Sequence, residues 1–142
     1  MSALEALQST LAGEHATLYT YGVLGARTSE SASPALYLAV DTAYRQHRAR
    51  RDHLRTLVAE AGGQPVAAEP AYSVDGALLR PAQVAAAALA LESESCTALT
   101  ALVAQTSGAV RQWALTEAVR SATWQLQLGG GPSTWPGAPE LS

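Results

Sequence analysis

Carboxylate side chains occur where a packed helix should present only apolar residues. An apolar stripe at steps of three and four residues is typical of a buried helix face, and Glu14 interrupts one formed by Leu4, Leu7, Leu11, Leu18 and Tyr21. Two further helical stripes contain Glu92 and Glu117. Because a lone buried carboxylate needs a proton or a charged partner, carboxylates at similar depth on three helices predict one shared polar cluster.

The predicted cluster has two chemical interpretations, which depend on its other polar members, Tyr44, His47, Arg51 and Arg120. Carboxylate oxygens and an imidazole nitrogen can bind iron or manganese, and a tyrosine phenolate can bind ferric iron or, more commonly, the hydroxyl bonds a neighbouring carboxylate. In the other interpretation, the arginines and a protonated histidine neutralise the three carboxylates, and the arginines do so through bidentate pairs. Arg120 favours this second interpretation, because a guanidinium stays protonated and offers no lone pair to a metal.

Four predicted helices, at about 2–26, 34–61, 81–106 and 109–128, carry these side chains. Ser2 and Glu5 have the spacing of a capping box, and Pro34 and Pro81 suit first helical positions. Glycines follow the second and fourth helices, where helices commonly end. Segment 62–80 contains glycines and prolines without a helical period, so it is expected to be a long crossover, and 129–142 is expected to be an irregular tail.

A single domain of residues 1–142 is expected, with an all-α, four-helix bundle topology. The chain of 142 residues is large enough to bury about two thirds of its unfolded surface without a structural metal. Two short links and one long link predict a four-helix bundle whose second connection crosses its whole length. This is sterically feasible, because roughly 18 extended residues span about 60 Å, whereas a helix of about 25 residues is about 38 Å long.

Composition restricts the class of function. All nine basic residues are arginine and the net charge is -3, which argues against a nucleic-acid partner because phosphate binding needs a cationic face. Cys96 is the single cysteine, so neither an internal disulfide nor a thiolate zinc cluster can form. The sequence has no signal-like start and no uninterrupted apolar run of about 18 residues, so we expect a cytoplasmic protein without a membrane partner.

Four short segments, EHATLYTYG, AYRQHRARRDHL, PVAAEPAY and WPG, resemble a small ferritin-like domain family of unknown function that is common in actinobacteria. The resemblance covers nearly the whole chain. It implies a ferritin-like fold, but it implies no particular reaction, because the family has no assigned activity.

Ferritin-like di-iron proteins place one Glu on each of two helices and a Glu-x-x-His motif on each of the other two. Glu14 and Glu92 match the single glutamates. The second helix keeps His47 but has Tyr44 where the motif has Glu, and the fourth keeps Glu117 but has Arg120 where the motif has His. The resemblance therefore implies a degenerate di-iron site.

The predicted function is that of a structural or interaction protein in which a buried network has replaced an ancestral di-metal site, with no cofactor. The alternative is a metal-dependent oxidoreductase or ferroxidase that binds iron or manganese through a reduced ligand set, Glu14, His47, Glu92 and Glu117. No catalytic residue is assigned, and whether the chain is an enzyme stays open. A homodimer is one expected assembly, other protein partners are unspecified, and Trp135 packs either on its own bundle or on a partner.

Overall fold

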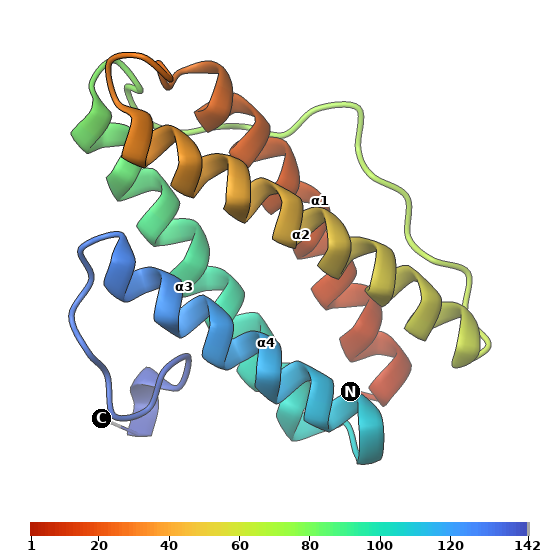
Figure 1. Ribbon diagram of the computed structural model, residues 1–142. Coiled ribbons are helices and arrows are strands. Elements are labelled where there is room, and N and C mark those ends of the chain that lie inside the picture. The colour runs from red at the N-terminus through yellow and green to blue at the C-terminus, as the bar shows by residue number, and fades with distance from the viewer. Residues whose placement is uncertain (142) are drawn as a thin grey trace.

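Four α-helices form the body of the molecule, which a computed structural model describes for residues 1–141 (Figure 1). The helices are α1 (Ala3–Ala26), α2 (Pro34–Glu60), α3 (Pro81–Gln105) and α4 (Gly108–Gln127), followed by the short 3-10 helix η1 (Pro139–Leu141). No strand occurs among residues 1–141, so the all-helical prediction is confirmed, and the arrangement is consistent with a four-helix bundle. Ser142, the end of the expected tail, lies outside the described residues.

The helix ends follow local sequence signals. At the start of α1, the Ser2 backbone N–H donates to Glu5 Oε2 at 2.6 Å and the Glu5 N–H donates to Ser2 Oγ at 3.2 Å, which completes the expected capping box. At the end of α2, Gly62 adopts a φ of 82°, a left-handed conformation that favours glycine. The Gly63 N–H then bonds the Val58 carbonyl at 2.9 Å, which satisfies an otherwise unpaired helix end.

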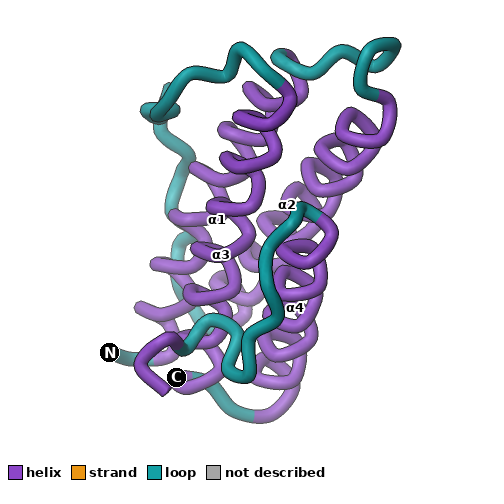
Figure 2. Tube along the Cα trace, turned by 90° about the vertical axis from the view of Figure 1, so that its left-hand side faces the viewer, coloured by secondary structure: helices purple, strands orange, loops and turns teal. Residues whose placement is uncertain are grey.

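The crossover between α2 and α3 runs along the outside of the bundle and is fastened to α1 (Figures 1 and 2). Gln8 donates to the Gln64 carbonyl at 2.6 Å and accepts from the Val66 N–H at 2.9 Å. Farther along α1, the rings of Tyr19 and Tyr72 lie 5.6 Å apart. The segment is therefore an ordered strap that brings the chain back to the opposite end of the bundle.

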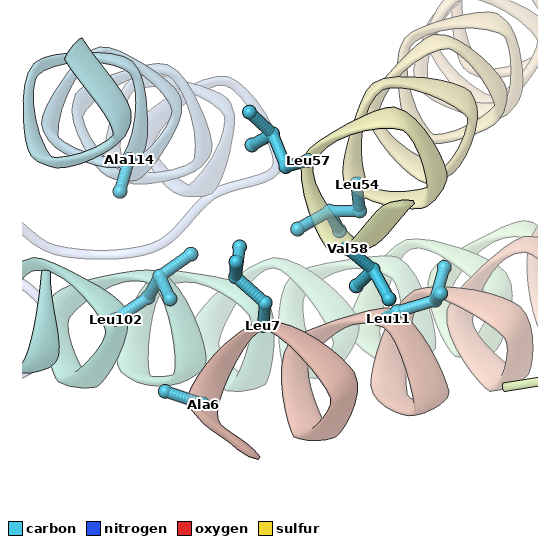
Figure 3. Packing of buried hydrophobic residues seen from close by; sticks show 8 residues of the cluster. All are labelled: Ala6, Leu7, Leu11, Leu54, Leu57, Val58, Leu102 and Ala114. Carbon is cyan, nitrogen blue, oxygen red and sulfur yellow. The ribbon is translucent and has the colours of Figure 1, made fainter. Parts of the chain in front are cut away.

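Two apolar clusters fill the two ends of the bundle. One, shown in Figure 3, joins all four helices and contains Ala6, Leu7, Leu11, Leu54, Leu57, Val58, Leu102 and Ala114. The other lies toward the opposite end and contains Tyr21, Leu24, Val40, Ala43, Val84 and Ala88. The middle of the bundle, between these clusters, is the layer in which the buried polar residues lie.

Helix α3 is long and apolar enough, by length and composition, to be a candidate membrane span. The sequence shows no uninterrupted apolar run of that length, but the mean hydropathy of an 18-residue window in α3 reaches 1.3 because it is rich in alanine and leucine. A core helix passes the same test. In this structure α3 packs against the other helices and carries Glu92, a buried residue with charged partners.

The C-terminal tail packs on α3 and is less irregular than the sequence predicts, because it includes η1. Thr100 donates to the Pro136 carbonyl at 3.2 Å, and Ala138 is buried. Trp135, which belongs to this tail, remains 52% exposed, so about half of its surface is open to solvent. Gly137 makes the close approach: its φ is 77°, and a Cβ there would lie 2.5 Å from the Cys96 carbonyl oxygen and in conflict with Thr100.

We expect Gly137→Ala to destabilise the protein by about 1 to 3 kcal/mol, because the substitution forces both a strained φ and a backbone clash. Urea denaturation, followed by tryptophan fluorescence, would measure the loss. Gly131→Ala is the matched control, since its added Cβ meets nothing within 4 Å. Equal stability of the two variants would show that the tail is not held at Gly137.

Candidate functional site

A connected set of polar side chains from all four helices occupies the middle layer of the bundle. Its buried members are Glu14 and Tyr21 of α1, His47 and Arg50 of α2, Glu92 of α3, and Glu117 and Ser121 of α4. We call this set the buried network. Each of these side chains is at least nine-tenths buried, so its charges interact with one another rather than with solvent.

His47 bridges two carboxylates with its two ring nitrogens. Nδ1 lies 2.8 Å from Glu14 Oε2, and Nε2 lies 2.9 Å from Glu92 Oε1. Because an ionised carboxylate only accepts hydrogen bonds, both nitrogens must carry protons and the ring is an imidazolium. Burial disfavours this charge, but Glu14 and Glu92 outweigh it and raise the pKa of His47 to about 9.

Arg50 links the remaining carboxylate to the same network. Its Nη1 donates to Glu14 Oε1 at 3.1 Å, its Nε donates to Glu117 Oε2 at 3.0 Å, and its Nη2 donates to Ser121 Oγ at 3.3 Å. A planar guanidinium with five donors can serve three acceptors at once. Arg50 therefore joins α2 to α1 and α4 through one side chain.

Tyr21 is a second hydrogen-bond partner of Glu92, beside His47. The Tyr21 hydroxyl donates to Glu92 Oε1 at 2.6 Å, and its ring stacks on the His47 ring at a centroid distance of 5.0 Å. Burial alone would raise the pKa of Glu92, but His47, Tyr21 and the nearby Ser121 hydroxyl together lower it. Glu92 Oε2 nevertheless has no hydrogen-bond partner among the described residues.

The network is electrically balanced. Glu14, Glu92 and Glu117 contribute three negative charges, and His47 and Arg50 contribute two positive ones; Arg120 supplies the third by pairing with Glu117. Removing one member of such a set leaves an uncompensated buried charge, which costs about 3 to 5 kcal/mol.

The structure brings together five of the seven residues that the sequence placed in the cluster, namely Glu14, His47, Glu92, Glu117 and Arg120. Arg120 differs from the expectation in burial, because 46% of its side chain is exposed. It reaches Glu117 from the solvent side of α4 and so closes the network at its edge.

Two predicted members, Arg51 and Tyr44, do not belong to the network. Arg51 instead pairs with Asp52 at 2.7 Å near the surface. The Tyr44 ring lies beside α1 at Gly22, and among the described residues its hydroxyl makes no hydrogen bond to the network. The stripe of α2 that turns inward passes through Ala43 and Arg50, each one residue earlier than predicted. One residue rotates a side chain by about 100°, which moves Tyr44 and Arg51 to the flank.

Sequence reasoning missed Arg50 and the role of Tyr21, although both carried a signal. Tyr21 follows Glu14 by seven residues on the predicted apolar stripe of the first helix, which places it two turns along the same face. Arg50 follows His47 by three residues, a spacing that shares a face as well as the four-residue spacing to Arg51 does. Periodicity alone could not choose between the two arginines.

His15 also lies in a position that the sequence did not specify. It is a buried residue of α1 that lies under the crossover, and its Nε2 lies 3.0 Å from the Val66 carbonyl. Because a carbonyl oxygen only accepts, Nε2 carries the proton. His15 thus holds the strap and takes no part in the buried network.

The residues of the network do not fit a di-metal centre. Both nitrogens of His47 and both oxygens of Glu14 already have partners, and Arg50 places a permanent cation between Glu14 and Glu117. One carboxylate oxygen, Glu92 Oε2, lacks a partner. Within residues 1–141, no group of three or more His, Cys, Asp or Glu side chains is arranged to hold a metal ion.

Comparison with known proteins identifies a family and a similar solved structure. A family model described as "Domain of unknown function (DUF4439)" matches residues 6–140. The crystal structure of a conserved hypothetical protein, rv2844, from Mycobacterium tuberculosis is similar, with 30% sequence identity and a TM-score of 0.81 over 89% of this chain and 93% of that chain. No curated protein matches the chain.

The protonated state of His47 predicts a pH-dependent stability. Because folding raises the pKa of His47 from 6.5 to about 9, its contribution is fully present below pH 6.5 and is lost as the pH rises through about 9. The full loss is on the order of 3 kcal/mol. Thermal unfolding across this range would measure it.

His47→Gln is the control for this prediction, because a neutral amide does not titrate. We expect the variant to be less stable at neutral pH and to lose the decline between pH 6.5 and about 9. Proton NMR of the His47 ring offers a direct readout in the unmodified chain. A ring that titrates near its ordinary value would contradict the assignment of an imidazolium.

Proposed function

We propose that this chain, which belongs to the family described as a domain of unknown function (DUF4439), is a structural or interaction protein built on a ferritin-like bundle. In this proposal, the buried network has taken the place of an ancestral di-metal site. The observation that carries the proposal is Arg50, whose guanidinium bonds both Glu14 and Glu117 inside the bundle.

The ferritin-like assignment is supported by the four residues that meet in the middle layer of the bundle. Glu14 and Glu92 come from α1 and α3, the positions of the single glutamates, and His47 and Glu117 come from α2 and α4, where the motif has its paired ligands. All four lie in the buried network. Ferritin-like bundles have one long crossover connection, and the ordered segment between α2 and α3 is such a connection.

The loss of a metal role is supported by electrostatics. In a di-metal site, bound cations neutralise the surrounding carboxylates, whereas here the cations are side chains of the protein. A further divalent cation would face the positive charge of Arg50 and would have to displace hydrogen bonds already made to Glu14 and Glu117. The same carboxylates then serve to fix the register of the helices.

The alternative, a metal-dependent oxidoreductase with a reduced ligand set, has one observation in its favour. Glu92 Oε2 is buried and lacks a partner, and an orphaned carboxylate oxygen is a ready donor for a cation. A single free oxygen is fewer than the ligands that iron or manganese requires, so this alternative ranks second.

Metal content separates the two functions. We expect protein purified from cells supplied with iron and manganese to contain substoichiometric metal. Elemental analysis by mass spectrometry would measure it. A stoichiometric ion in the unmodified chain that is lost on Glu92→Ala would overturn the structural proposal.

Arg50→Ala tests whether the arginine is what keeps a cation out. Removing the guanidinium leaves Glu14 and Glu117 short of a partner, so we expect this variant to be less stable by about 3 to 5 kcal/mol and to regain stability with added Mn²⁺. Arg48→Ala, at an exposed position on the same helix, is the matched control. It should change neither the stability nor the response of the stability to Mn²⁺.

An interaction role is supported by an uncharged stripe on the outer face of α4. Leu115, Val119 and Leu126 are 47%, 59% and 50% exposed, and the smaller Ala122 lies between the last two. Their steps of four, three and four residues match the seam of a coiled coil. The four residues line a groove of 320 Å³ whose other walls come from α3 and the tail. A second copy related by a two-fold axis would present the same stripe, so a homodimer through α4 is the proposed assembly.

Val119→Glu should disrupt this dimer. A two-fold axis brings the two new carboxylates toward one another across an apolar seam, so we expect the dimer dissociation constant to rise at least about a hundredfold. Sedimentation equilibrium would measure the change. Leu38→Glu, at a residue of α2 that is 65% exposed, is the control that should leave the dimer intact. A monomeric unmodified chain would exclude the assembly.

A further inference from the structure

The molecule has a second groove, which lies beside the buried network. It is a groove of 430 Å³ between α1 and α3, and residues 73–75 of the crossover form part of its wall. We call it the α1–α3 groove. Its volume falls within the range of about 300 to 1,000 Å³ that is usual for small-molecule sites. It touches the network only at Glu14, whose two oxygens are already occupied by His47 and Arg50.

Two largely buried residues of the groove wall carry hydroxyl groups. Thr17 and Ser95, from α1 and α3, are 8% and 5% exposed. Other hydroxyls in the groove wall bond backward along their own helix, as Thr10 does to the Ala6 carbonyl and Thr20 to the Ala16 carbonyl. Among residues 1–141, neither Thr17 nor Ser95 makes such a bond. Neither hydroxyl oxygen is among the buried atoms that lack a partner, so both are open to the groove and can accept a hydrogen bond from a molecule there.

The charges around the groove are all of one sign. Glu94 of α3 and Asp75 of the crossover lie on its wall, and neither forms an ion pair within the described part of the chain. No arginine or histidine lines the groove, and the chain contains no lysine. The groove therefore favours a cation over an anion or a neutral molecule.

The remaining wall is aliphatic. Ala16, Ala87, Ala90, Leu91 and Ala98 supply methyl and methylene surface, and no aromatic ring lines the groove. Such a wall suits a methylene chain and offers no face on which a planar ring could stack. Apolar surface with a few convergent polar groups is the usual composition of a ligand site.

Gly13 forms part of the α1 wall of the groove. It lies in the interior of α1 and lines the groove, and a Cβ built on it would meet nothing within 4 Å. A glycine within a helix costs about 0.8 to 1.0 kcal/mol relative to alanine. Packing does not require a glycine at this exposed position, so a larger side chain can be introduced there without a clash at its Cβ.

We propose that the α1–α3 groove binds a linear aliphatic diamine. Its methylene chain would lie along the alanine wall, and its two ammonium groups would donate to Glu94, Asp75 and the free hydroxyls of Thr17 and Ser95. Each ammonium has three donors and no acceptor, which matches a lining of carboxylates and accepting hydroxyls. This site is independent of the proposed function, because no contact within the buried network has to change.

Isothermal titration calorimetry with cadaverine tests the site in the full chain. We expect cadaverine to bind, pentylamine to bind more weakly, and pentanediol not to bind. Glu94→Gln and Asp75→Asn, both at exposed positions, should each weaken cadaverine binding about tenfold. Glu60→Gln removes one exposed carboxylate elsewhere on the chain and should leave binding unchanged.

Gly13→Leu fills the groove without removing any charge. Leucine is a better helix former than glycine and its Cβ meets open space, so the variant should fold and should lose cadaverine binding. Its melting temperature, compared with that of the unmodified chain, checks the fold. The proposal is overturned if cadaverine does not bind, if pentanediol binds equally, if Gly13→Leu binds normally, or if Glu60→Gln weakens binding as much as Glu94→Gln.

Discussion

The balance of charge in the middle layer is the constraint on which the rest of the bundle depends. Each helix contributes at least one ionisable side chain to this layer, and none of the three glutamates can remain ionised in an apolar interior by itself. His47 and Arg50 solve the problem by each contacting two carboxylates from different helices. The apolar clusters at the two ends supply the burial that drives folding, while the polar layer joins all four helices through specific ion pairs.

The four helices do not all approach one another equally. Side chains of the paired helices α1 and α2, and of α3 and α4, pack closely, whereas long side chains bridge the space between α2 and α4. Trp124 Nε1 donates to Gln46 Oε1 at 2.7 Å, and the rings of His53 and Trp113 lie 4.8 Å apart. Arg50 spans the same side to reach Glu117. A guanidinium with a long aliphatic stem fits this wider gap better than a short side chain could.

The fold was largely predictable from the sequence because its signals are local. Proline at the start of α2 and α3, and glycine after α2 and α4, act through backbone conformations that do not depend on distant residues. The polar cluster was predictable only in part. Periodicity located the stripe containing His47. The choice between Arg50 and Arg51 depends on where α4 lies in the tertiary structure, which periodicity does not report. The unpartnered hydroxyls of Thr17 and Ser95 leave no trace in sequence, because their neighbours decide whether a threonine or serine is satisfied.

The distribution of charge along the chain has a consequence for assembly. The first two helices contribute Glu14, His47 and Arg50, a net positive half, and the last two contribute Glu92, Glu117 and Arg120, a net negative half. Neither helical hairpin can close its own interior without an unmatched charge, so each is the electrostatic counterpart of the other. A neutral interior therefore requires both hairpins, and neither hairpin supplies it alone.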